Sequence, residues 1–467
     1  MTDYRTEKDT LGEVRVPADA LWGAQTQRAV ENYPISGLRE HPTFIRSFIY
    51  LKKAAALANK ELGAMEARLA DAIVPACDEL LNNEAKYRDQ FPVDVFQAGA
   101  GTSFNMNCNE VIANIANRAL GGKVGEYKSI HPNDHVNMAQ STNDVFPTAI
   151  RVAVTIHLGL LIPEVQKLAN AFDQKGTQFA DVIKSGRTHL QDAVPVTLGQ
   201  EFKAYAAAIK RANRLLVDAS MELLELGIGG TAAGTGINTP KGYRFAVVRH
   251  LNAITGLEFR PIDDLREGMQ SQLPIAGVSG ALRNLSLELT RITNDLRLLA
   301  SGPQTGLAEI ILPSVQPGSS IMPGKVNPSM LECMNQVLFH IIGADTAIAY
   351  ANQAGQLELN VMMPLMAFEM MFSIEILKNF LPVLVEKCIR GIEADRERSR
   401  EYYISSPSLA TALNPLIGYA RAAEIAKESA KSGKPIPDLL REKKLLSEEE
   451  IARIFTPEFL VGQADRV

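Results

Sequence analysis

Hydrophobic residues repeat with helical spacing through the middle of the chain. One stripe has successive intervals of 3, 4, 3, 4 and 3 positions, which is the pattern of a helix that packs against other helices. Its members are Leu282, Leu285, Leu289, Ile292, Leu296 and Leu299. Comparable long segments cover about 151–180, 200–226, 330–352 and 365–392, whereas strand patterns are short, such as 13–16. We therefore predict a mainly α protein built on a long helix bundle.

The length of the chain predicts more than one domain. At about 150 residues per domain, 467 residues give about three domains. We place the boundaries near residue 140 and at the charged run that begins at Asp395, which divides the chain into 1–140, 141–395 and 396–467. The hydrophobic stripe by itself fits either a monomeric bundle or a bundle shared between subunits.

Residues 313–328 are unsuited to both helix and strand. Four prolines and two glycines interrupt this segment, so we predict a surface loop. The loop nevertheless gathers two hydroxyls, a cation and an amide, from Ser319, Ser320, Lys325 and Asn327. Such groups are suited to holding a small carboxylate and to supporting negative charge that develops on it. A flexible, solvated connector is the alternative for a loop of this composition.

Five segments together carry a resemblance to a known family. The loop reads GSSIMPGKVNP and resembles the GSSxMPxKxNP signature of the fumarase/aspartase superfamily. The other segments follow in the family's order: GTSFNMN at 101–107, HPND at 131–134, QSTND at 140–144 and GRTHLQD at 186–192. Because the similarity runs from residue 21 to the carboxy terminus, the chain is identified as a member of this superfamily. Membership implies a smaller amino-terminal domain, a long central bundle, a short carboxy-terminal helical domain, and a homotetramer whose central helices pack into one core.

The resemblance assigns the chemistry of elimination to particular residues. It implies that Ser319 is the base that removes a proton from the carbon beside a carboxylate, helped by Lys325 and by backbone N–H groups of the loop. A serine hydroxyl is a poor base at neutral pH, so its surroundings have to activate it. Lys325 and Asn327, with Thr188, are implied to bind the α-carboxylate, the lysine by its charge and the asparagine by directed hydrogen bonds.

The remaining implied roles concern the second carboxylate and the amino group. Four hydroxyls are implied to donate to the β-carboxylate, those of Thr102, Ser141, Thr142 and Ser320. Helix capping is the commoner use of an isolated serine or threonine and is the alternative for each of them. The side-chain oxygen of Asn143, with Thr102 and His189, is implied to hold the amino group. His189 is also implied to position groups and to support charge.

Glu332 has two interpretations. It matches the acidic residue that faces the histidine, here His189, in relatives. Residues 329–332 also form the pattern of a capping box that opens the next helix. Both interpretations stay open from the sequence.

The motifs also bear on which group is eliminated. Residues typical of aspartases are Ser103, Thr142, Leu190, Val194, 239–243 and 354–357. Features shared with fumarases are Gly324, His189 and 22–27. We therefore expect elimination of ammonia from L-aspartate to give fumarate, with the hydration of fumarate as the alternative. An inactive relative kept as a structural or binding protein would lack the signature residues Ser319, Lys325 and Asn327, and all three are present.

The composition of the chain limits which binding partners and which cellular compartment we expect. A hydrophobic content of 46%, a charged content of 22% and a net charge of −5 give no reason to expect nucleic acid or an anionic membrane as partner. The four cysteines contain no C-x-x-C pair, which favours a reducing compartment, and residues 1–9 do not resemble a signal peptide. Residues 145–163 are apolar but interrupted by Pro147, Arg151 and His157, so they are a poor membrane span. We expect a cytoplasmic enzyme that acts on a small dicarboxylate or amino acid.

Two further patterns are weak signals for a cofactor. The glycine-rich residues 229–236 lack both the G-K-[ST] and the G-x-G-x-x-G motifs that bind phosphates and dinucleotides. His131 and His135 have the spacing of a metal pair, but Pro132 opposes a regular helix there. His131, Asn133 and Asp134 instead match a secondary carboxylate-binding patch of fumarases. We expect no cofactor and no metal site.

Overall fold

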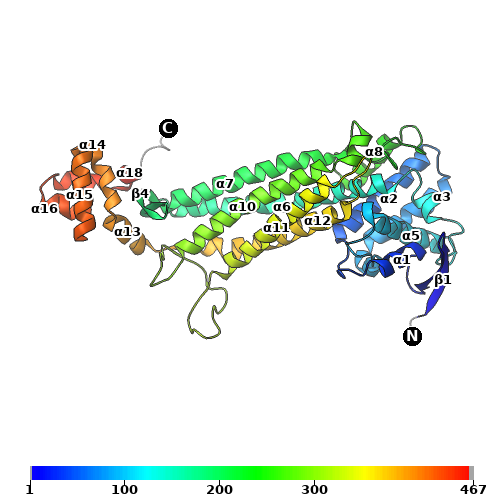
Figure 1. Cartoon of the computed structure of the whole chain (residues 1–467), viewed down its shortest axis with the longest axis horizontal. Helices are drawn as coiled ribbons and strands as arrows, with labels where there is room; N and C mark the ends of the chain where they lie inside the picture. The colour runs from blue at the N-terminus through cyan, green and yellow to red at the C-terminus, as the bar shows by residue number, and fades with distance from the viewer. Residues whose placement is uncertain (1–2, 462–467) are drawn as a thin grey trace. The chain divides into compact units, whose positions relative to one another are not determined.

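The computed structural model describes residues 3–461 and is mainly helical (Figure 1). Five long helices dominate it, namely α6 (Thr142–Gln178), α7 (Leu198–Ser220), α10 (Leu273–Leu299), α11 (Ser329–Gln353) and α12 (Met363–Lys387). These helices match the long segments predicted from hydrophobic spacing. The predicted mainly α fold is confirmed.

Shorter helices precede, interrupt and follow the five long ones. In the amino-terminal part these are α1 (Ala24–Asn32), α2 (Pro42–Glu61), α3 (Ala67–Asn82), α4 (Glu84–Tyr87) and α5 (Thr102–Ala119). Two lie between α7 and α10, namely α8 (Tyr243–Thr255) and α9 (Leu265–Gln270). The carboxy-terminal ones are α13 (Arg396–Ser405), α14 (Asn414–Ile417), α15 (Tyr419–Ser432), α16 (Ile436–Glu442), α17 (Glu448–Ile454) and α18 (Pro457–Leu460). Short 3₁₀- or π-helical segments occur at Arg88–Gln90, Gly99–Gly101, Pro132–Val136, Met221–Leu224, Ile389–Gly391 and Pro407–Leu413.

The strands form four two-stranded pairs. Antiparallel pairs join β1 (Tyr4–Asp9) to β2 (Gly12–Pro17), β3 (Ile183–Thr188) to β4 (Gln191–Thr197), and β7 (Ile310–Ile311) to β8 (Glu393–Ala394). A short parallel pair joins β5 (Glu225–Leu226) to β6 (Arg260–Pro261). The strand predicted at 13–16 lies in β2, and the β3–β4 hairpin carries the GRTHLQD motif.

The described chain divides into two compact units. The first comprises the amino-terminal residues up to Ile162, with Arg214–Asn284 and Phe339–Lys378. The second comprises Pro163–Asn213, Leu285–Leu338 and the residues from Asn379 onward. Each of the five long helices contributes one part to each unit. The division at residues 140 and 395 into three domains stays a prediction.

An aromatic cluster packs three helices of the first unit together. Phe44 and Phe48 of α2, Phe104 of α5 and Phe146 of α6 are fully buried, with ring centroids 5.1 to 5.6 Å apart. Such edge-to-face and offset contacts add about 0.5–1.5 kcal/mol per pair beyond burial. The cluster fixes the start of α5 against the start of α6, where two of the family motifs lie.

The leucine stripe of α10 is buried, as its spacing predicts. Polar contacts also join α10 to α11 in each unit. In the first, Asp345 accepts hydrogen bonds from Ser279 at 2.7 Å and from Arg283 at 3.0 Å. In the second, Asn335 donates to Asn294 at 2.9 Å. These directed contacts fix the register of the two helices, which apolar packing alone specifies less strictly.

Helix α6 is apolar and long enough, by length and composition, to cross a membrane. However, 72% of its most apolar window is buried inside the structure. That burial is typical of a core helix, because a membrane span would expose its apolar surface to lipid.

Candidate functional site

The first group of predicted site residues lies where α5 and α6 begin. Thr102 is the first residue of α5 and is exposed. Gly101 before it has a φ of 86°, and an added Cβ would clash with the ring of Phe146. Only glycine fits this turn, which therefore brings Thr102 close to the start of α6. Thr142 is the first residue of α6 and is buried, with 8% of its surface exposed.

Ser141 and Asp144 form the cap of α6. The Ser141 hydroxyl accepts a hydrogen bond from the Asn143 backbone N–H at 3.2 Å, so the capping alternative applies to Ser141. Asp144 Oδ1 accepts from the Ser141 N–H at 2.9 Å. Its Oδ2 accepts from the N–H groups of Gly229 and Thr231 at 3.0 and 2.9 Å. Burial raises the pKa of Asp144 to about 6, and these N–H donors oppose that rise.

The glycine-rich segment at 229–236 thus has a structural role that the sequence did not indicate. Asp144 holds its backbone, and Asn143 Nδ2 donates to the Ala232 carbonyl at 2.9 Å. This bond fixes the amide of Asn143, because its nitrogen is the atom facing a carbonyl. Asn143 Oδ1 therefore points away from the Ala232 carbonyl. The predicted contact with an amino group requires this, because an amino group donates to an oxygen.

The second group lies at the tip of the β3–β4 hairpin. Thr188 ends β3, and His189 and Leu190 form the two-residue turn. Both turn residues have positive φ values, 56° and 58°, and all three residues are exposed. Asn-Gly is the usual sequence for such a turn, and left-handed backbone costs a non-glycine residue about 1–2 kcal/mol. The strain falls on the predicted catalytic histidine, and strain of this kind concentrates at functional sites.

A buried ionic cluster supports this hairpin and was missed by sequence reasoning. Glu309 is fully buried and lies 3.1 Å from Lys184 Nζ and 2.9 Å from Arg187 Nη1. Lys184 is also buried and pairs with Glu201 at 2.7 Å. Both cations come from β3, so the cluster fixes the strand that leads to Thr188. Glu309 carries no motif and lies far away in sequence, so only the fold reveals it.

The third group lies in the signature loop, which forms no helix or strand, as predicted. The loop closes on itself: the Gly318 N–H donates to the Lys325 carbonyl at 2.9 Å, and Asn327 Nδ2 donates to the Gly318 carbonyl at 2.6 Å. The backbones meet so closely at Gly318 that an added Cβ would lie 2.6 Å from the nitrogen of Asn327. Ser320 and Lys325 have exposed side chains.

Ser319 is half-buried and makes a local turn within this closed loop. Its Oγ accepts hydrogen bonds from the N–H groups of Met322, at 2.9 Å, and Ile321, at 3.3 Å. Two backbone donors aimed at one hydroxyl oxygen stabilise negative charge on it. Within residues 3–461, no hydrogen bond or ion pair joins this loop to the hairpin tip of the same chain.

The capping box predicted at 329–332 is wrong. Helix α11 begins at Ser329 itself, and the Glu332 N–H donates to the Pro328 carbonyl at 3.1 Å. That bond places Ser329 inside the first turn rather than at the cap, because the carbonyl of the cap residue accepts the first helical bond. Glu332 therefore has no capping role, and its predicted contact with a histidine stays a prediction.

The secondary patch at 131–134 overlaps one π-helical turn, Pro132–Val136, with His131 as the cap of that turn. Pro132 prevents a regular helix, as predicted. His135 Nδ1 accepts from the His131 backbone N–H at 2.9 Å, and His131 Nδ1 lies 3.3 Å from Asp134. Both histidines are thereby used in local contacts.

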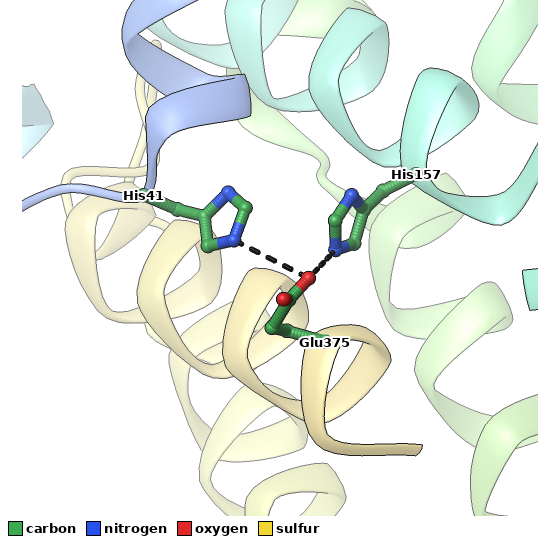
Figure 2. Close-up of side chains that lie close together, drawn as sticks. All are labelled: His41, His157 and Glu375. Atoms are coloured by element: carbon green, nitrogen blue, oxygen red, sulfur yellow. Dashed lines mark ion pairs between the residues drawn. The ribbon is translucent and has the colours of Figure 1, made fainter. Parts of the chain in front are cut away.

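A different cluster, of two histidines and a glutamate, lies in the first unit (Figure 2). His157 Nε2 and His41 Nε2 lie 2.7 and 3.5 Å from the same oxygen, Oε2 of Glu375. Lys378 Nζ donates to that oxygen as well, at 2.7 Å. His41 Nδ1 accepts from the Thr43 N–H at 3.1 Å, which leaves Nε2 as the protonated nitrogen of the neutral ring.

Glu375 thus accepts a hydrogen bond from Lys378 and lies within ion-pair distance of both histidine rings. Ligand atoms around zinc, with bonds of about 2.0 Å, lie about 3.3 Å apart, whereas 2.7 Å is a hydrogen-bonding distance. A metal would also have to displace Lys378 and change the tautomer of His41. Burial and the neighbouring His157 lower the pKa of His41 to about 4, and burial lowers that of His157. The cluster links the start of α2 to α6 and α12.

The comparisons with known proteins agree with this architecture. A family model described as lyase matches residues 12–343, and one described as the fumarase C carboxy terminus matches residues 409–462. The chain therefore belongs to this lyase family, the fumarase/aspartase superfamily that its motifs resemble.

Individual relatives match over nearly their whole length. Aspartate ammonia-lyase from a Bacillus species is 48% identical over 456 residues, covering 98% of this chain and 97% of that protein. Aspartate ammonia-lyase from Escherichia coli K12 is 47% identical, with coverage of 99% and 97%. Among solved structures, a Brucella melitensis fumarate lyase:delta crystallin bound to cobalt has a TM-score of 0.93 at 46% identity, covering 97% of this chain and 98% of that one. The class II fumarase of Schistosoma mansoni has a TM-score of 0.94 at 34% identity, with coverage of 99% and 100%.

Proposed function

We propose that the chain is an aspartate ammonia-lyase, a carbon–nitrogen lyase that converts L-aspartate reversibly into fumarate and ammonia. The observation that carries this proposal is identity of 47–48% over nearly full length to proteins of that name. The aspartase-like residues of the motifs support it independently. Class II fumarate hydratase is the alternative, favoured by the structural likeness to a fumarase and by the fumarase-like carboxy-terminal match.

The chemical difficulty of the reaction is the removal of a weakly acidic proton from Cβ. We assign this step to Ser319, whose oxygen faces two backbone N–H donors. Ser319 acts as the oxyanion, after its own hydroxyl proton has been lost to solvent: this oxygen takes the Cβ proton and becomes a hydroxyl, and the electron pair of the C–H bond moves onto the β-carboxylate. The double bond then forms between Cβ and Cα as the Cα–N bond breaks, and the amine leaves with its electron pair and takes up a proton. Lys325, exposed in the same loop, supplies positive charge that favours the anionic oxygen.

The two carboxylates and the amine need separate binding groups. Lys325, Asn327 and Thr188 are assigned to the α-carboxylate. Asn327 Nδ2 donates one hydrogen to the Gly318 carbonyl, so its second hydrogen is the one available to substrate. The side-chain oxygen of Asn143 is assigned to the amine, in keeping with the fixed orientation of its amide.

The β-carboxylate carries the charge that grows in the transition state. Thr102, Ser141, Thr142 and Ser320 are assigned to it as hydroxyl donors. Thr142 and Ser141 lie at the amino terminus of α6, a helix of 37 residues, where the helix dipole also favours an anion. His189 is assigned to positioning and charge support, with Glu332 as its acidic partner.

We further propose that the enzyme is a cytoplasmic homotetramer whose active sites draw on three subunits. The long helices support association, because large apolar side chains remain exposed on them in the single chain: Leu287, Leu298, Phe339, Tyr350 and Phe372. Exposed apolar surface on core helices is typical of a protein interface. The three motif groups would then meet at the corners of the shared bundle.

The proposal is tested by following fumarate absorbance after L-aspartate is added to the purified protein. Ser319→Ala is the control, since it removes the assigned base from an exposed loop and leaves the fold intact. We expect fumarate formation by the wild type and a loss of about a thousandfold or more in the variant. Fumarate formation by the variant within tenfold of the wild type would assign the proton to another group. No formation by the wild type would reject the proposed activity.

A further inference from the structure

A lysine lies buried behind the predicted carboxylate site. Lys52 of α2 is fully buried. Its Nζ donates to three amide oxygens, Oδ1 of Asn105 at 2.8 Å, Oδ1 of Asn137 at 3.0 Å and Oε1 of Gln140 at 2.9 Å. Three acceptors equal the three hydrogens of an ammonium group, so the arrangement is complete for the charged form.

This cation fixes the orientation of one amide. An ammonium group is only a donor, so the atom of Asn105 that faces Lys52 has to be oxygen. The other terminal atom of Asn105 is then the amide nitrogen, which donates to Thr142 Oγ1 at 2.9 Å and to Asn137 Oδ1 at 3.3 Å. Asn105 is thus the link between a buried charge and a predicted substrate-binding hydroxyl.

The hydrogen bond from Asn105 determines where the Thr142 hydroxyl can donate its own hydrogen. Because Oγ1 already accepts from Asn105, its own hydrogen points elsewhere. No hydrogen bond among residues 3–461 uses that hydrogen, although Thr142 is buried. A buried hydroxyl hydrogen without an acceptor is costly, and the cost is removed when an anionic oxygen binds. Without Asn105 as donor, the hydroxyl would be free to rotate away from such a ligand.

Burial lowers the pKa of Lys52 to about 7. The three amide oxygens act against this, because a neutral amine would turn its lone pair toward one of them. Only the Asn105 side chain separates the positive charge of Lys52 from Thr142. In a buried, low-dielectric environment that charge also favours the binding of a dianionic substrate.

We infer that Lys52 and Asn105 are positioning residues of the elimination: Lys52 orients the Asn105 amide, which aims the Thr142 hydroxyl at the β-carboxylate of the substrate. The inference rests on the proposed function only for the identity of that substrate. The alternative role for Lys52 is a purely structural one, as a buried cation that joins α2 to the turn before α6.

Asn105→Asp separates the two roles. The new side chain has the same shape, and a carboxylate pairs with Lys52 at least as well as an amide oxygen does, so the contact with Lys52 survives although the bond to Asn137 is lost. A carboxylate cannot donate to Thr142, however, and would instead accept its hydrogen. We expect kcat/KM for L-aspartate to fall about a hundredfold, the cost of losing one donor to developing charge, and the melting temperature shows that the variant measured is folded. Wild-type kcat/KM in a folded Asn105→Asp would overturn the inference.

Lys52→Met, with Lys53→Met as its matched control, tests whether Lys52 orients the Asn105 amide. Lys53 is the next residue of α2, and its Nζ bonds the partly exposed Asp78 instead. We expect a fall in kcat/KM of about tenfold or more for Lys52→Met and none for Lys53→Met. Equal effects of the two substitutions would indicate a general perturbation of α2 and would contradict the inference.

A double-mutant cycle that combines Asn105→Asp with Thr142→Val shows whether Asn105 acts through the Thr142 hydroxyl or lowers kcat/KM in some other way. The comparison holds even where a single variant is less stable. If Asn105 acts through that hydroxyl, Asn105→Asp adds no further loss to Thr142→Val. Losses that multiply would overturn the inference. Should the wild type turn over L-malate rather than L-aspartate, the same cycle is read with L-malate, because both substrates carry the same β-carboxylate. Failure of the proposed function and failure of the positioning role are therefore separate results.

Discussion

Gly318→Ala is expected to disable the signature loop without destabilising the protein. An added Cβ would lie 2.6 Å from the nitrogen of Asn327 and 2.9 Å from Cα of Val326, with the Lys325 carbonyl closer still. Ordinary contact begins at 3.4 Å, so the two sides of the loop have to separate by about 1 Å to clear the nearest of these atoms. All three obstructing atoms belong to the backbone, which cannot rotate aside as a side chain can.

The residues that the added Cβ pushes apart are those assigned to catalysis. Moving Lys325 and Asn327 away from Ser319 by nearly 1 Å is expected to lower turnover about a hundredfold, equivalent to about 2.7 kcal/mol in the activation free energy. The loop is exposed and buries little apolar surface, so the melting temperature should stay within about 2 °C of the wild type. Fumarate absorbance measures the first quantity and circular dichroism the second.

Gly324→Ala is the matched control in the same loop. Its added Cβ meets nothing within 4 Å, and only its φ of 80° makes the substitution unfavourable. Backbone strain of about 1 kcal/mol should lower activity by less than about tenfold. Wild-type activity in Gly318→Ala, or an equal loss in both variants, would refute the assignment of a closed loop as the working geometry.

Three further predictions follow from other parts of the structure. Ser319→Ala and His189→Ala, each inactive alone, should regain about a quarter of the sites when they are unfolded together and reassembled in equal amounts as mixed tetramers; no recovery in proven mixed tetramers would contradict a site shared between subunits. Glu309→Ala should lower the free energy of unfolding by about 3 kcal/mol, because the buried Lys184 then keeps only Glu201 and the half-buried Arg187 loses its carboxylate, whereas Glu386→Ala, at an exposed pair with Arg390, should cost less than about 1 kcal/mol; similar urea midpoints would contradict the role of Glu309. The pKa of His41 is lowered from 6.5 to about 4 by burial and by His157, so the unfolded state binds its proton first and stability is lost as pH falls from 6.5 to 4. His41→Asn keeps a side-chain cap for α2 and should reduce the dependence of the melting temperature on pH across that window, with His157 supplying part of the remainder, and an unchanged slope would contradict this origin.

The sequence predicts the helices of this fold well, because long amphipathic spacing leaves few alternatives. The leucine stripe of α10 is helical and buried, and the proline-rich signature is a loop. The capping box at 329–332 fails because the helix begins one residue earlier than that pattern requires, as the bond from the Glu332 N–H to the Pro328 carbonyl shows. Local pattern alone does not decide which of two neighbouring residues begins a helix.

The supporting residues of the site were hidden for a different reason. Lys52, Asn105 and Glu309 gain their roles only from partners that the fold brings together. A lysine in the middle of an amphipathic helix is usually exposed, so nothing in the sequence around Lys52 indicates that three amide oxygens surround it. Contacts between distant segments of this kind become visible only in three dimensions.

The central claim is tested most directly by the ratio of kcat/KM for L-aspartate to kcat/KM for L-malate, measured as fumarate formation by one preparation. The two substrates differ only in the group on Cα, so the ratio reports the groups that hold the amine, Asn143 among them. The account predicts a ratio of at least about a hundred, or about 2.7 kcal/mol of differential transition-state binding. A ratio of one or less would identify a fumarate hydratase and contradict the proposed activity.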